Sequence, residues 1–313
     1  MNKISINLAK HSLKNMFNEL VSNILNQLIL IQKRGGLNIC MAAALLLIFS
    51  VGCKNSPEIK VQNMAMQLSS GSQTFSEELL KGEIADTKIE HISYAGPISQ
   101  TVALSKENVN IFLFIKGEGS LQADTTTYSI VPETIALPTT FSSITFNVAE
   151  GETLHFVQFT KKLSTQDLED LKAFPAENKY DIYFKKFSDC EAYTEKIKSP
   201  NTVSRTVLPA DIIPRVSLGT VETLGPDAVG AHKHPMLDQL FLGLAGNDAT
   251  VHADDKSTEF KGFSLLHIPV GSSHWVTVEK DKKMYYMWMD FFFTKEGQEW
   301  LKTHKPIIQD KKS

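Results

Sequence analysis

The chain has 313 residues, a formal net charge of -3 and 42% hydrophobic residues. This length is enough for one large domain or two small ones, each with its own core. The near balance of 32 basic and 35 acidic residues argues against nucleic acid or an anionic membrane surface as the partner. Of the three cysteines, Cys190 alone lies in the body of the chain, so no intrachain disulfide is expected there and simple packing is its expected role.

The stretch LNICMAAALLLIFSVGCKN, residues 37–55, has the composition of a targeting segment. Its apolar core of about 15 residues is shorter than the ~20 that cross a bilayer comfortably, and Lys33 and Arg34 precede it. The segment resembles a bacterial lipoprotein signal, although Ser50 stands where leucine is usual. The resemblance implies lipidation of Cys53 and an extracytoplasmic place in the cell envelope. A short membrane anchor and an ordinary secretory signal are the alternatives.

The rest of the chain divides by composition. A signal normally begins close to the first residue, so the polar stretch 1–32 suggests that the true start codon lies downstream. A polar segment with SSGSQ at residues 69–73 is expected to be a tether. The predicted units are an N-terminal extension and signal (1–53), a tether (54–82), a first barrel (83–160), a helical linker (161–200), a second barrel (201–293) and a C-terminal helix and tail (294–313).

From about residue 84 onward, short apolar runs alternate with turn residues. Runs such as VNIFLFIKGEG, DQLFLGLAGN and KMYYMWMDFFF are rich in Val, Ile, Phe and Tyr and are bounded by Gly, Pro, Asn or Asp. This spacing predicts an all-β sandwich or barrel. Helices are expected after the capping residue Ser164, in FSDCEAYTEKIKSP as far as Pro200, and after Thr294.

The two β-rich units are similar to each other in sequence. When NIFLFIKGEG (110–119) is aligned with QLFLGLAGND (239–248), Gly117 matches Gly246. Pro138 then falls near Pro269. Two copies of one small barrel are the simplest explanation of this match.

Three histidines of the second unit are candidate metal ligands. Side chains alternate along a strand, so His232 and His234 are expected to point the same way, and His274 follows on a later strand. Three imidazoles with one side-chain oxygen suit Zn, Fe, Mn, Ni or Cu.

These residues resemble the two motifs of the cupin superfamily. The first motif is a pair of histidines one residue apart, then a glutamate and a glycine, and Gly246 matches that glycine. The second motif is Pro-x-Gly-x-x-His, matched by Pro269, Gly271 and His274. The resemblance implies a bicupin of two double-stranded β-helix (jelly-roll) barrels, with His232, His234 and His274 as ligands of a divalent transition metal.

The fourth ligand departs from the cupin pattern, because no glutamate stands at its position. Counting back from the glycine places Gln239 there, and counting forward from the histidines places Asp238 there. The fixed step to the glycine favours Gln239. A carboxylate binds a divalent cation better than an amide does, so Asp238 remains the alternative, brought inward by a bulge.

The first unit lacks the imidazoles of the second. Ala103 and Ser105 stand where the histidine pair should be, Asn110 at the fourth ligand position and Ser143 at the last histidine. The sequence therefore predicts a degenerate first barrel that binds no metal.

Three further side chains are candidate substrate contacts. Arg215 could hold a carboxylate, although a solvated or salt-bridged role is the favoured alternative. Tyr286 and Asp290 share one face of the last strand with Trp288, where they either line the cavity or belong to the packed wall.

The resemblance implies a metal-dependent enzyme acting on a small organic molecule. A Lewis-acidic ion suits sugar or sugar-acid isomerisation and related ring-opening or decarboxylation steps. An Fe(II)-dependent dioxygenase and a non-enzymatic, ligand-binding lipoprotein are the alternatives. Cupin barrels often dimerise through edge strands, which implies a homodimer unless the degenerate half replaces the second subunit.

Overall fold

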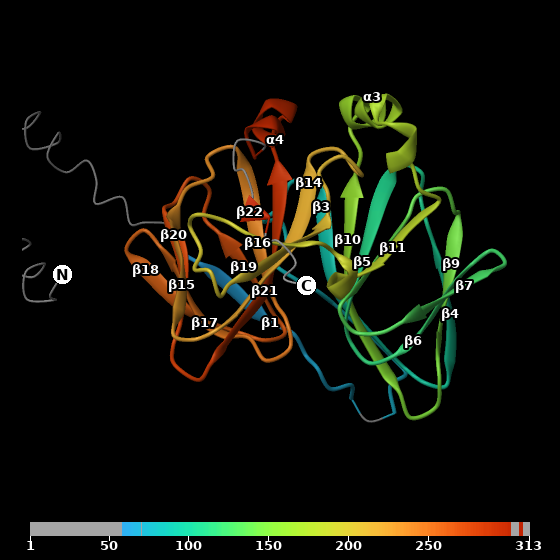
Figure 1. Ribbon diagram of the computed structural model, residues 1–313. Helices are drawn as coiled ribbons and strands as arrows, with labels where there is room; N and C mark the ends of the chain where they lie inside the picture. Colours follow the sequence, from blue (N-terminus) through green and yellow to red (C-terminus); the bar gives the residue numbers. More distant parts are fainter. Residues whose placement is uncertain (1–57, 70, 302–306, 309–313) are drawn as a thin grey trace, which may run out of the picture. The chain divides into compact units, whose positions relative to one another are not determined.

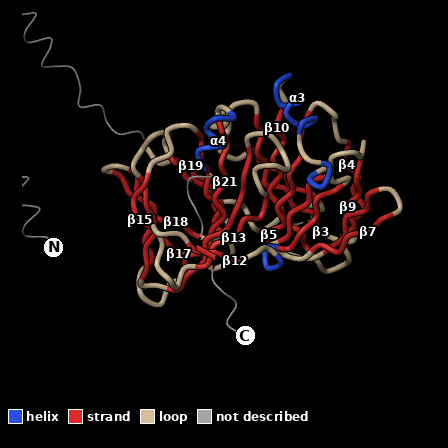
Figure 2. The backbone as a smooth tube through the Cα atoms, turned by 45° about the horizontal axis from the view of Figure 1, so that its top comes forward, coloured by secondary structure: helices blue, strands red, loops and turns tan. Residues whose placement is uncertain are grey.

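The computed structural model describes residues 58–69, 71–301 and 307–308. The predicted N-terminal extension, the targeting segment and Cys53 lie outside these described residues. Within the described ranges, no helix is long and apolar enough to cross a membrane. Figure 2 shows that strands predominate and that helices are confined to a few short segments.

The first barrel packs a six-stranded sheet against a four-stranded one. Its strands are β2 (Thr74–Glu78), β3 (Thr87–Ala95), β4 (Ile98–Ala103), β5 (Asn108–Lys116), β6 (Gly119–Ala123), β7 (Thr126–Ile130), β8 (Thr134–Pro138), β9 (Ser143–Val148), β10 (Thr153–Lys162) and β11 (Ile182–Lys186). The larger sheet has the order β11-β8-β5-β10-β3-β2, and the smaller has the order β4-β9-β6-β7. Alternation along β5 and β10 turns Phe112, Phe114 and Phe156 inward, where they pack with Phe146. Phenylalanine rings therefore fill the interior of this barrel.

The second barrel repeats the plan with an eight-stranded and a four-stranded sheet. Its strands are β1 (Lys60–Asn63), β12 (Ala192–Thr194), β13 (Val203–Leu208), β14 (Val216–Leu224), β15 (Asp227–His232), β16 (Leu237–Gly243), β17 (Asp248–Ala253), β18 (Lys256–Lys261), β19 (Ser264–Ile268), β20 (His274–Val278), β21 (Lys283–Phe292) and β22 (Ile307–Ile308). The orders are β1-β19-β16-β21-β14-β13-β12-β22 and β15-β20-β17-β18. Figure 1 shows this barrel mostly in orange and red and the first in blue-green to green. The prediction of an all-β chain with two barrels is confirmed.

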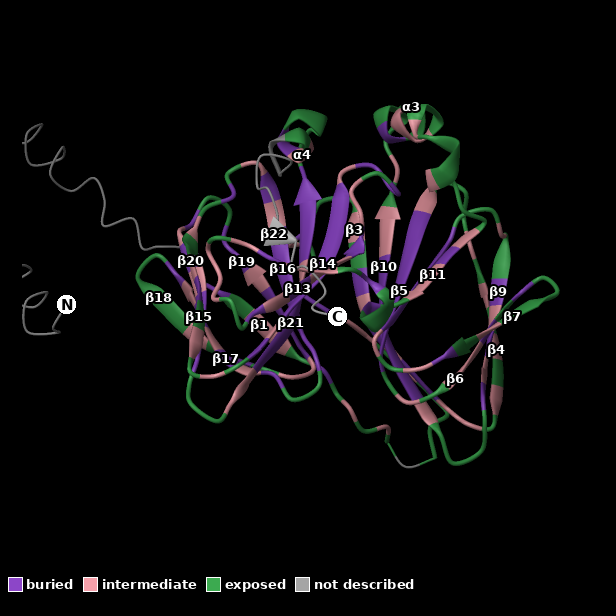
Figure 3. Ribbon diagram, viewed as in Figure 1, coloured by how far each residue is buried: buried purple, intermediate pink, exposed green. Residues whose placement is uncertain are grey.

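A shared apolar core joins the larger sheets of the two barrels. Leu113, Val157 and Phe159 of the first barrel belong to the same buried cluster as Leu240 and Met289 of the second. Figure 3 shows β14 and β21, which carry part of this cluster, as largely buried. The two barrels of the chain thus pack sheet against sheet, as two subunits of a dimer would. Formation of a homodimer stays a prediction.

The repeat seen in the sequence has a structural counterpart. Gly117 and Gly246 both adopt a positive φ, +79° and +80°, which favours glycine at the turn that follows β5 and β16. Ala103 pairs with Ser143 across β4 and β9. Residues 232 and 274 form the matching pair across β15 and β20. The aligned positions therefore occupy equivalent places in the two barrels.

The tether prediction for residues 54–82 needs correction, because this segment contains two strands. β1 adds to β19 in the second barrel, and β2 adds to β3 in the first. Each strand pairs through backbone hydrogen bonds with the edge of a sheet. The polar sequences of β1 and β2 did not indicate this pairing. The segment therefore binds both barrels instead of hanging free.

The helical linker is only partly helical. Ser164 is the N-cap of helix α3 (Thr165–Ala173) and forms the expected capping box. Thr294, just before α4 (Lys295–Leu301), accepts a hydrogen bond from the Gly297 N–H. The helix predicted from FSDCEAYTEKIKSP is wrong, because that stretch forms a short 3-10 turn at Phe187–Asp189 and strand β12. Pairing of β12 with β13 and β22 outweighs the local helical preference.

A buried pair of imidazoles lies on the larger sheet of the first barrel. His91 and His155 stack with ring centroids 5.4 Å apart, and His91 Nε2 lies 3.2 Å from His155 Nδ1. Ser93 Oγ is 2.7 Å from His155 Nδ1, and the Glu77 carboxylate is 3.2 Å from His91 Nδ1. Burial, and then the neighbouring His91, lower the pKa of His155 to about 4.

This pair predicts a loss of stability in mild acid. Below pH ~6.5 the unfolded chain takes up a proton that folded His155 refuses until about pH 4, so the free energy of unfolding falls across that range. The full effect is about 3 kcal/mol. Urea unfolding of metal-free protein at pH 7.5 and pH 4.5 measures it. In His155→Leu, the free energy of unfolding should change less between the two pH values. An equal change in both proteins would contradict the assignment of the effect to His155.

Candidate metal centre and its cavity

The three predicted histidines meet at one point in the second barrel. His232 ends β15 and lies directly opposite His274, the first residue of β20. His234 lies two residues beyond the end of β15, in the loop before β16, and still reaches the same place. One ligand nitrogen from each of the three lies within 4.8 Å of the others. Bonds of about 2.1 Å allow opposed ligands ~4.2 Å apart, so small side-chain rotations would bring this set to bonding distance.

Backbone carbonyls select the metal-binding form of two of these rings. His232 Nδ1 lies 2.8 Å from the Gly230 carbonyl oxygen, and His274 Nδ1 lies 3.3 Å from that of Ser272. A proton on each Nδ1 that donates to these carbonyls makes Nε2 the unprotonated nitrogen, which is the form that binds a metal. In the described part of the chain, His274 Nε2 is buried without a hydrogen-bond partner. Burial, and then His232, lower the pKa of His274 to about 3, so the ring is neutral near pH 7.

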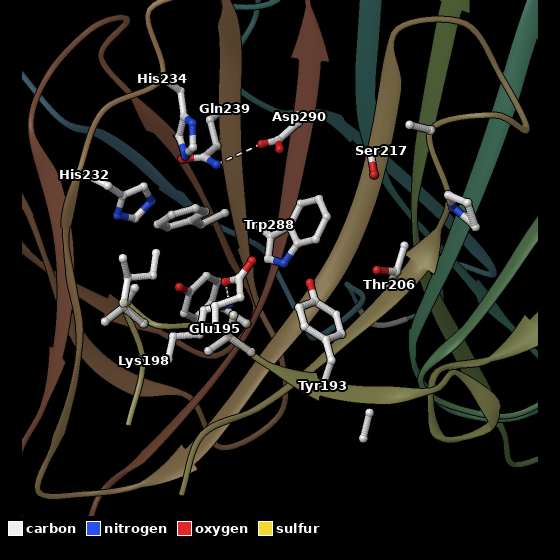
Figure 4. Close-up of a pocket in the computed structure, with 18 of the residues that line it drawn as sticks. Tyr193, Glu195, Lys198, Thr206, Ser217, His232, His234, Gln239, Trp288 and Asp290 are labelled. Carbon is white, nitrogen blue, oxygen red and sulfur yellow. Dashed lines mark hydrogen bonds and ion pairs between the residues drawn. The ribbon is translucent and has the colours of Figure 1, made fainter. Parts of the chain in front are cut away.

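Gln239 supplies an oxygen beside the histidines. Its Nε2 donates to Asp290 Oδ1 at 2.8 Å, and its Oε1 is buried with no hydrogen-bond partner among the described residues. Figure 4 shows the amide nitrogen turned toward Asp290 and the oxygen on the side of His234. Burial raises the pKa of Asp290 to about 7, with the bond from Gln239 acting in the opposite direction. Asp290 thus orients an amide oxygen toward the three imidazoles.

Asp238, the alternative fourth ligand, points the other way. Alternation along β16 places it on the opposite face from Gln239. Its Oδ1 lies 3.6 Å from Nε2 of His267, and His267 Nδ1 lies 2.9 Å from a Glu83 carboxylate oxygen. Asp238 is therefore engaged with a histidine outside the candidate metal centre.

The donor set fits a divalent transition metal. Three imidazole nitrogens and one amide oxygen form the borderline N/O environment that Zn, Fe, Mn and Ni accept. The unpartnered Nε2 of His274 and Oε1 of Gln239 are the observations that call for a bound ion, since buried polar atoms are nearly always satisfied. We expect His232, His234, His274 and Gln239 to hold it.

Substitutions of Gln239 and Asp238, the two candidates for the fourth ligand, should affect metal affinity differently. Gln239→Ala removes the oxygen beside the histidines and should weaken metal affinity by about 10-fold or more. Asp238→Ala removes a side chain from the other face of β16 and should leave the affinity unchanged. Competition titration against a chromogenic chelator measures both. A metal defect confined to the Asp238 variant would reverse the assignment.

A cavity of about 690 Å³ opens from the histidines. Tyr286, Trp288 and Asp290 line it from one face of β21, as the sequence allowed. Arg215 does not: its Nη2 lies 2.7 Å from Asp167 Oδ2, which places it in the salt-bridged role and corrects its candidacy as a substrate contact.

The sequence analysis missed one wall of this cavity. Tyr193, Glu195 and Lys198 line it from β12 and the turn that follows. These residues lie in the stretch predicted to be a helix. The spacing of Glu195 and Lys198 suits a helix as well as a turn, so no local pattern identified them.

Comparison with solved structures identifies the architecture. A glyoxylate-induced protein from Pseudomonas aeruginosa matches 70% of this chain and 80% of its own, with a TM-score of 0.58 and 11% identity. An oxalate decarboxylase from Lactobacillus farciminis matches 78% of this chain and 90% of its own, with a TM-score of 0.55 and 10% identity. A cupin 2 conserved barrel domain protein from Leptotrichia buccalis matches 74% of this chain and 96% of its own, with a TM-score of 0.53 and 15% identity. The fold is that of the cupins. No family model and no curated protein matches the sequence.

Within the cupin fold, the candidate metal centre occupies one barrel. The histidines are the motif residues singled out in the sequence, and His232 and His234 line the cavity of the second barrel. At the equivalent place in the first barrel, Asn110 Oδ1 accepts hydrogen bonds from Gln158 Nε2 and Thr160 Oγ1, both at 3.1 Å. A satisfied amide oxygen there contrasts with the unpartnered one of Gln239.

Proposed function

We propose that the chain is a metal-dependent cupin enzyme that acts on a small organic molecule. The observation that carries the proposal is the meeting of three imidazoles beside an oriented amide oxygen that has no hydrogen-bond partner among the described residues, with two of the imidazoles and the amide lining a cavity. A bound divalent cation supplies Lewis acidity, which polarises a carbonyl or carboxylate oxygen and suits isomerisation, ring opening or decarboxylation. A neutral amide in place of a carboxylate leaves the site more positive.

The chain's own residues would position and shield the substrate. Phe241, Tyr286 and Trp288 line the cavity with apolar surface that excludes water from the reacting end. Asp290 fixes Gln239, and with a pKa near neutrality it could hold or release a proton beside the metal centre. Sugar or sugar-acid isomerisation remains the reaction predicted from the sequence.

A non-enzymatic binding role is the second candidate. It is favoured by the engagement of two carboxyl groups that line the cavity: Asp290 accepts from Gln239, and Glu195 is ion-paired with Lys198. A carboxylate that is already occupied is a poorer general base. The two candidates share the metal centre and differ in turnover.

Elemental analysis of protein purified without added metal tests the shared part, with one equivalent of metal expected. Turnover is then measured after loading Fe, Zn, Mn or Ni, against aldoses, uronates and catechols, with oxygen consumption reporting the Fe(II) dioxygenase alternative. Turnover with a loaded metal and none in the metal-free protein supports the enzyme. A ligand that raises the melting temperature without reacting supports the binding protein, and absence of metal overturns both.

The lipid anchor at Cys53 and the cell-envelope location are further proposals. They rest on the apolar segment and the cysteine that ends it. Mass spectrometry of the mature N-terminus tests them: a diacylglyceryl-modified cysteine is expected, and an unmodified N-terminus upstream of residue 53 would contradict them.

A further inference from the structure

Strand β15 is irregular just before it delivers His232 to the candidate metal centre. Val229 and His232 both line the cavity, although residues three apart in a regular strand point to opposite faces. The register of β15 against β20 shifts between these two residues, so that Gly230 and Ala231 together lie opposite Trp275. Two residues opposite one make a β-bulge. The extra residue leaves Ala231 exposed and turns His232 toward the cavity, where Figure 4 draws it.

The first barrel shows what this strand does without the bulge. Its counterpart β4 also has six residues and also follows a Gly-Pro pair, at 96–97 in place of 225–226. β4 pairs with β9 in an unbroken register from Ile98 to Ala103. Regular alternation then continues to the end of the strand: Val102 packs toward the interior and Ala103 is exposed. The bulge therefore belongs to the barrel that carries the histidines, and it determines which way residue 232 faces.

The loop between β12 and β13, residues 195–202, holds this bulge and is called the clamp loop below. The Gly230 N–H donates to the Ile197 carbonyl oxygen at 2.6 Å. The carbonyl oxygen of the same glycine lies 2.8 Å from His232 Nδ1. A Cβ atom at residue 230 would lie only 3.1 Å from the Ile197 carbonyl oxygen, so the loop fits closely against the glycine. Gly230 thus connects the clamp loop to the imidazole.

The clamp loop is itself anchored to the second barrel. The side chain of Ile197 packs against the apolar core of that barrel. At the start of β15, Asp227 Oδ2 accepts from Ser199 Oγ at 2.6 Å and from Thr202 Oγ1 at 3.2 Å, and also from Thr223 Oγ1 at 2.8 Å. β15 is an edge strand of its sheet. The loop therefore supports this edge at both ends, as a neighbouring strand would.

We infer that the clamp loop positions His232 for metal binding. The Ile197 carbonyl fixes the bulge, the bulge turns the imidazole into the cavity, and the Gly230 carbonyl holds the proton on Nδ1 so that Nε2 faces the metal. Ile197 and Gly230 are positioning residues, since they act through His232. The inference rests on the proposed metal-dependent function, and it makes a loop outside the histidine motifs a determinant of the metal site.

A bulky side chain at residue 230 tests the inference. Gly230→Val places a β-branched side chain against the Ile197 carbonyl and should weaken Zn affinity by about 10-fold or more. Ala228→Val is the matched control, because it adds the same side chain at an exposed position of the same strand and should leave the affinity unchanged. Competition titration against a chelator measures both. Wild-type affinity in Gly230→Val overturns the inference.

A double-mutant cycle tests whether the loop acts through the imidazole. Once His232→Ala has removed the ring, adding Gly230→Val should cause no further loss of Zn affinity, measured against a weaker chelator. A further loss as large as in the wild-type background overturns the positioning role. Should Gly230→Val fail to fold, Ser199→Ala with Thr202→Val loosens the other end of the loop and should lower the affinity in the same direction. Unchanged affinity in that variant overturns the inference as well.

The ring of His232 in metal-free protein distinguishes failure of the inference from failure of the proposed function. Long-range proton–nitrogen correlation spectra should show the Nδ1–H tautomer in the wild type and in Ala228→Val, and a mixture of both tautomers in Gly230→Val. This change without any metal binding would retain the clamp and reject the metal-dependent function. Stoichiometric metal, with the same tautomer and the same Zn affinity in Gly230→Val, would retain that function and reject the clamp.

Discussion

His234→Ala is expected to purify without stoichiometric metal. The substitution removes one of the three imidazoles that converge within 4.8 Å, and His232, His274 and Gln239 cannot complete a tetrahedral set alone. Loss of a residue that merely orients a ligand costs 10–100-fold in metal affinity, so loss of the ligand itself should cost at least about 100-fold. Elemental analysis after dialysis and competition titration measure the change.

The first barrel supplies a matched control for this variant. Ser143 occupies, opposite Ala103, the position that His274 occupies opposite His232. Ser143→Ala should therefore leave the metal content at the wild-type value. Full metal content in the His234 variant would show that the metal lies elsewhere, and loss of metal in the Ser143 variant would show that the first barrel participates.

The candidate metal centre was predictable from sequence because its ligands obey local spacing rules. A strand end places residues 232 and 234 near each other, and the glycine at position 246, with a φ of +80°, fixes the count back to Gln239. Sequence spacing alone left Asp238 as an alternative. The alternation of β16 in three dimensions separated the two, since one side chain faces the cavity and its neighbour faces His267.

The opposite wall of the cavity was not predictable in this way. Tyr193, Glu195 and Lys198 line the cavity because β12 pairs with β13 and holds this segment against the second barrel. That pairing is a long-range event, and the local pattern suggested a helix. The strands β1 and β2 escaped prediction for the same reason, because a polar edge strand resembles a tether until its partner is known.

Arg215 shows how a charged residue can be assigned only from its surroundings. In sequence it was a candidate clamp for a substrate carboxylate, with a salt bridge as the favoured alternative. In the structure its Nε donates to Asp167 Oδ1 at 2.9 Å and its Nη1 donates to the Phe293 carbonyl at 3.0 Å. The guanidinium thus ties helix α3 to the ends of β14 and β21, and its partner carboxylate belongs to the chain itself.

Asp167→Ala is therefore expected to destabilise the protein by about 3 kcal/mol. The carboxylate is 1% exposed, and its Oδ2 also accepts from the Ser164 backbone N–H at 2.9 Å and from Ser164 Oγ at 2.8 Å. Burial alone would raise the pKa of Asp167, but the bonds from Arg215 and Ser164 outweigh it and lower the pKa. The substitution removes the Asp167 half of the capping box and leaves a guanidinium without its partner. Urea unfolding at pH 7 measures the loss.

A double-mutant cycle separates the ion pair from the cap. Arg215→Met leaves the capping box intact, so the coupling energy between the two sites reports the bidentate contact and should be about 1.5–3 kcal/mol. Because neither residue lines the cavity, both variants should keep the wild-type metal content. A coupling energy near zero would reduce the contact to a surface ion pair. A loss of metal in Arg215→Met would connect that residue to the candidate metal centre.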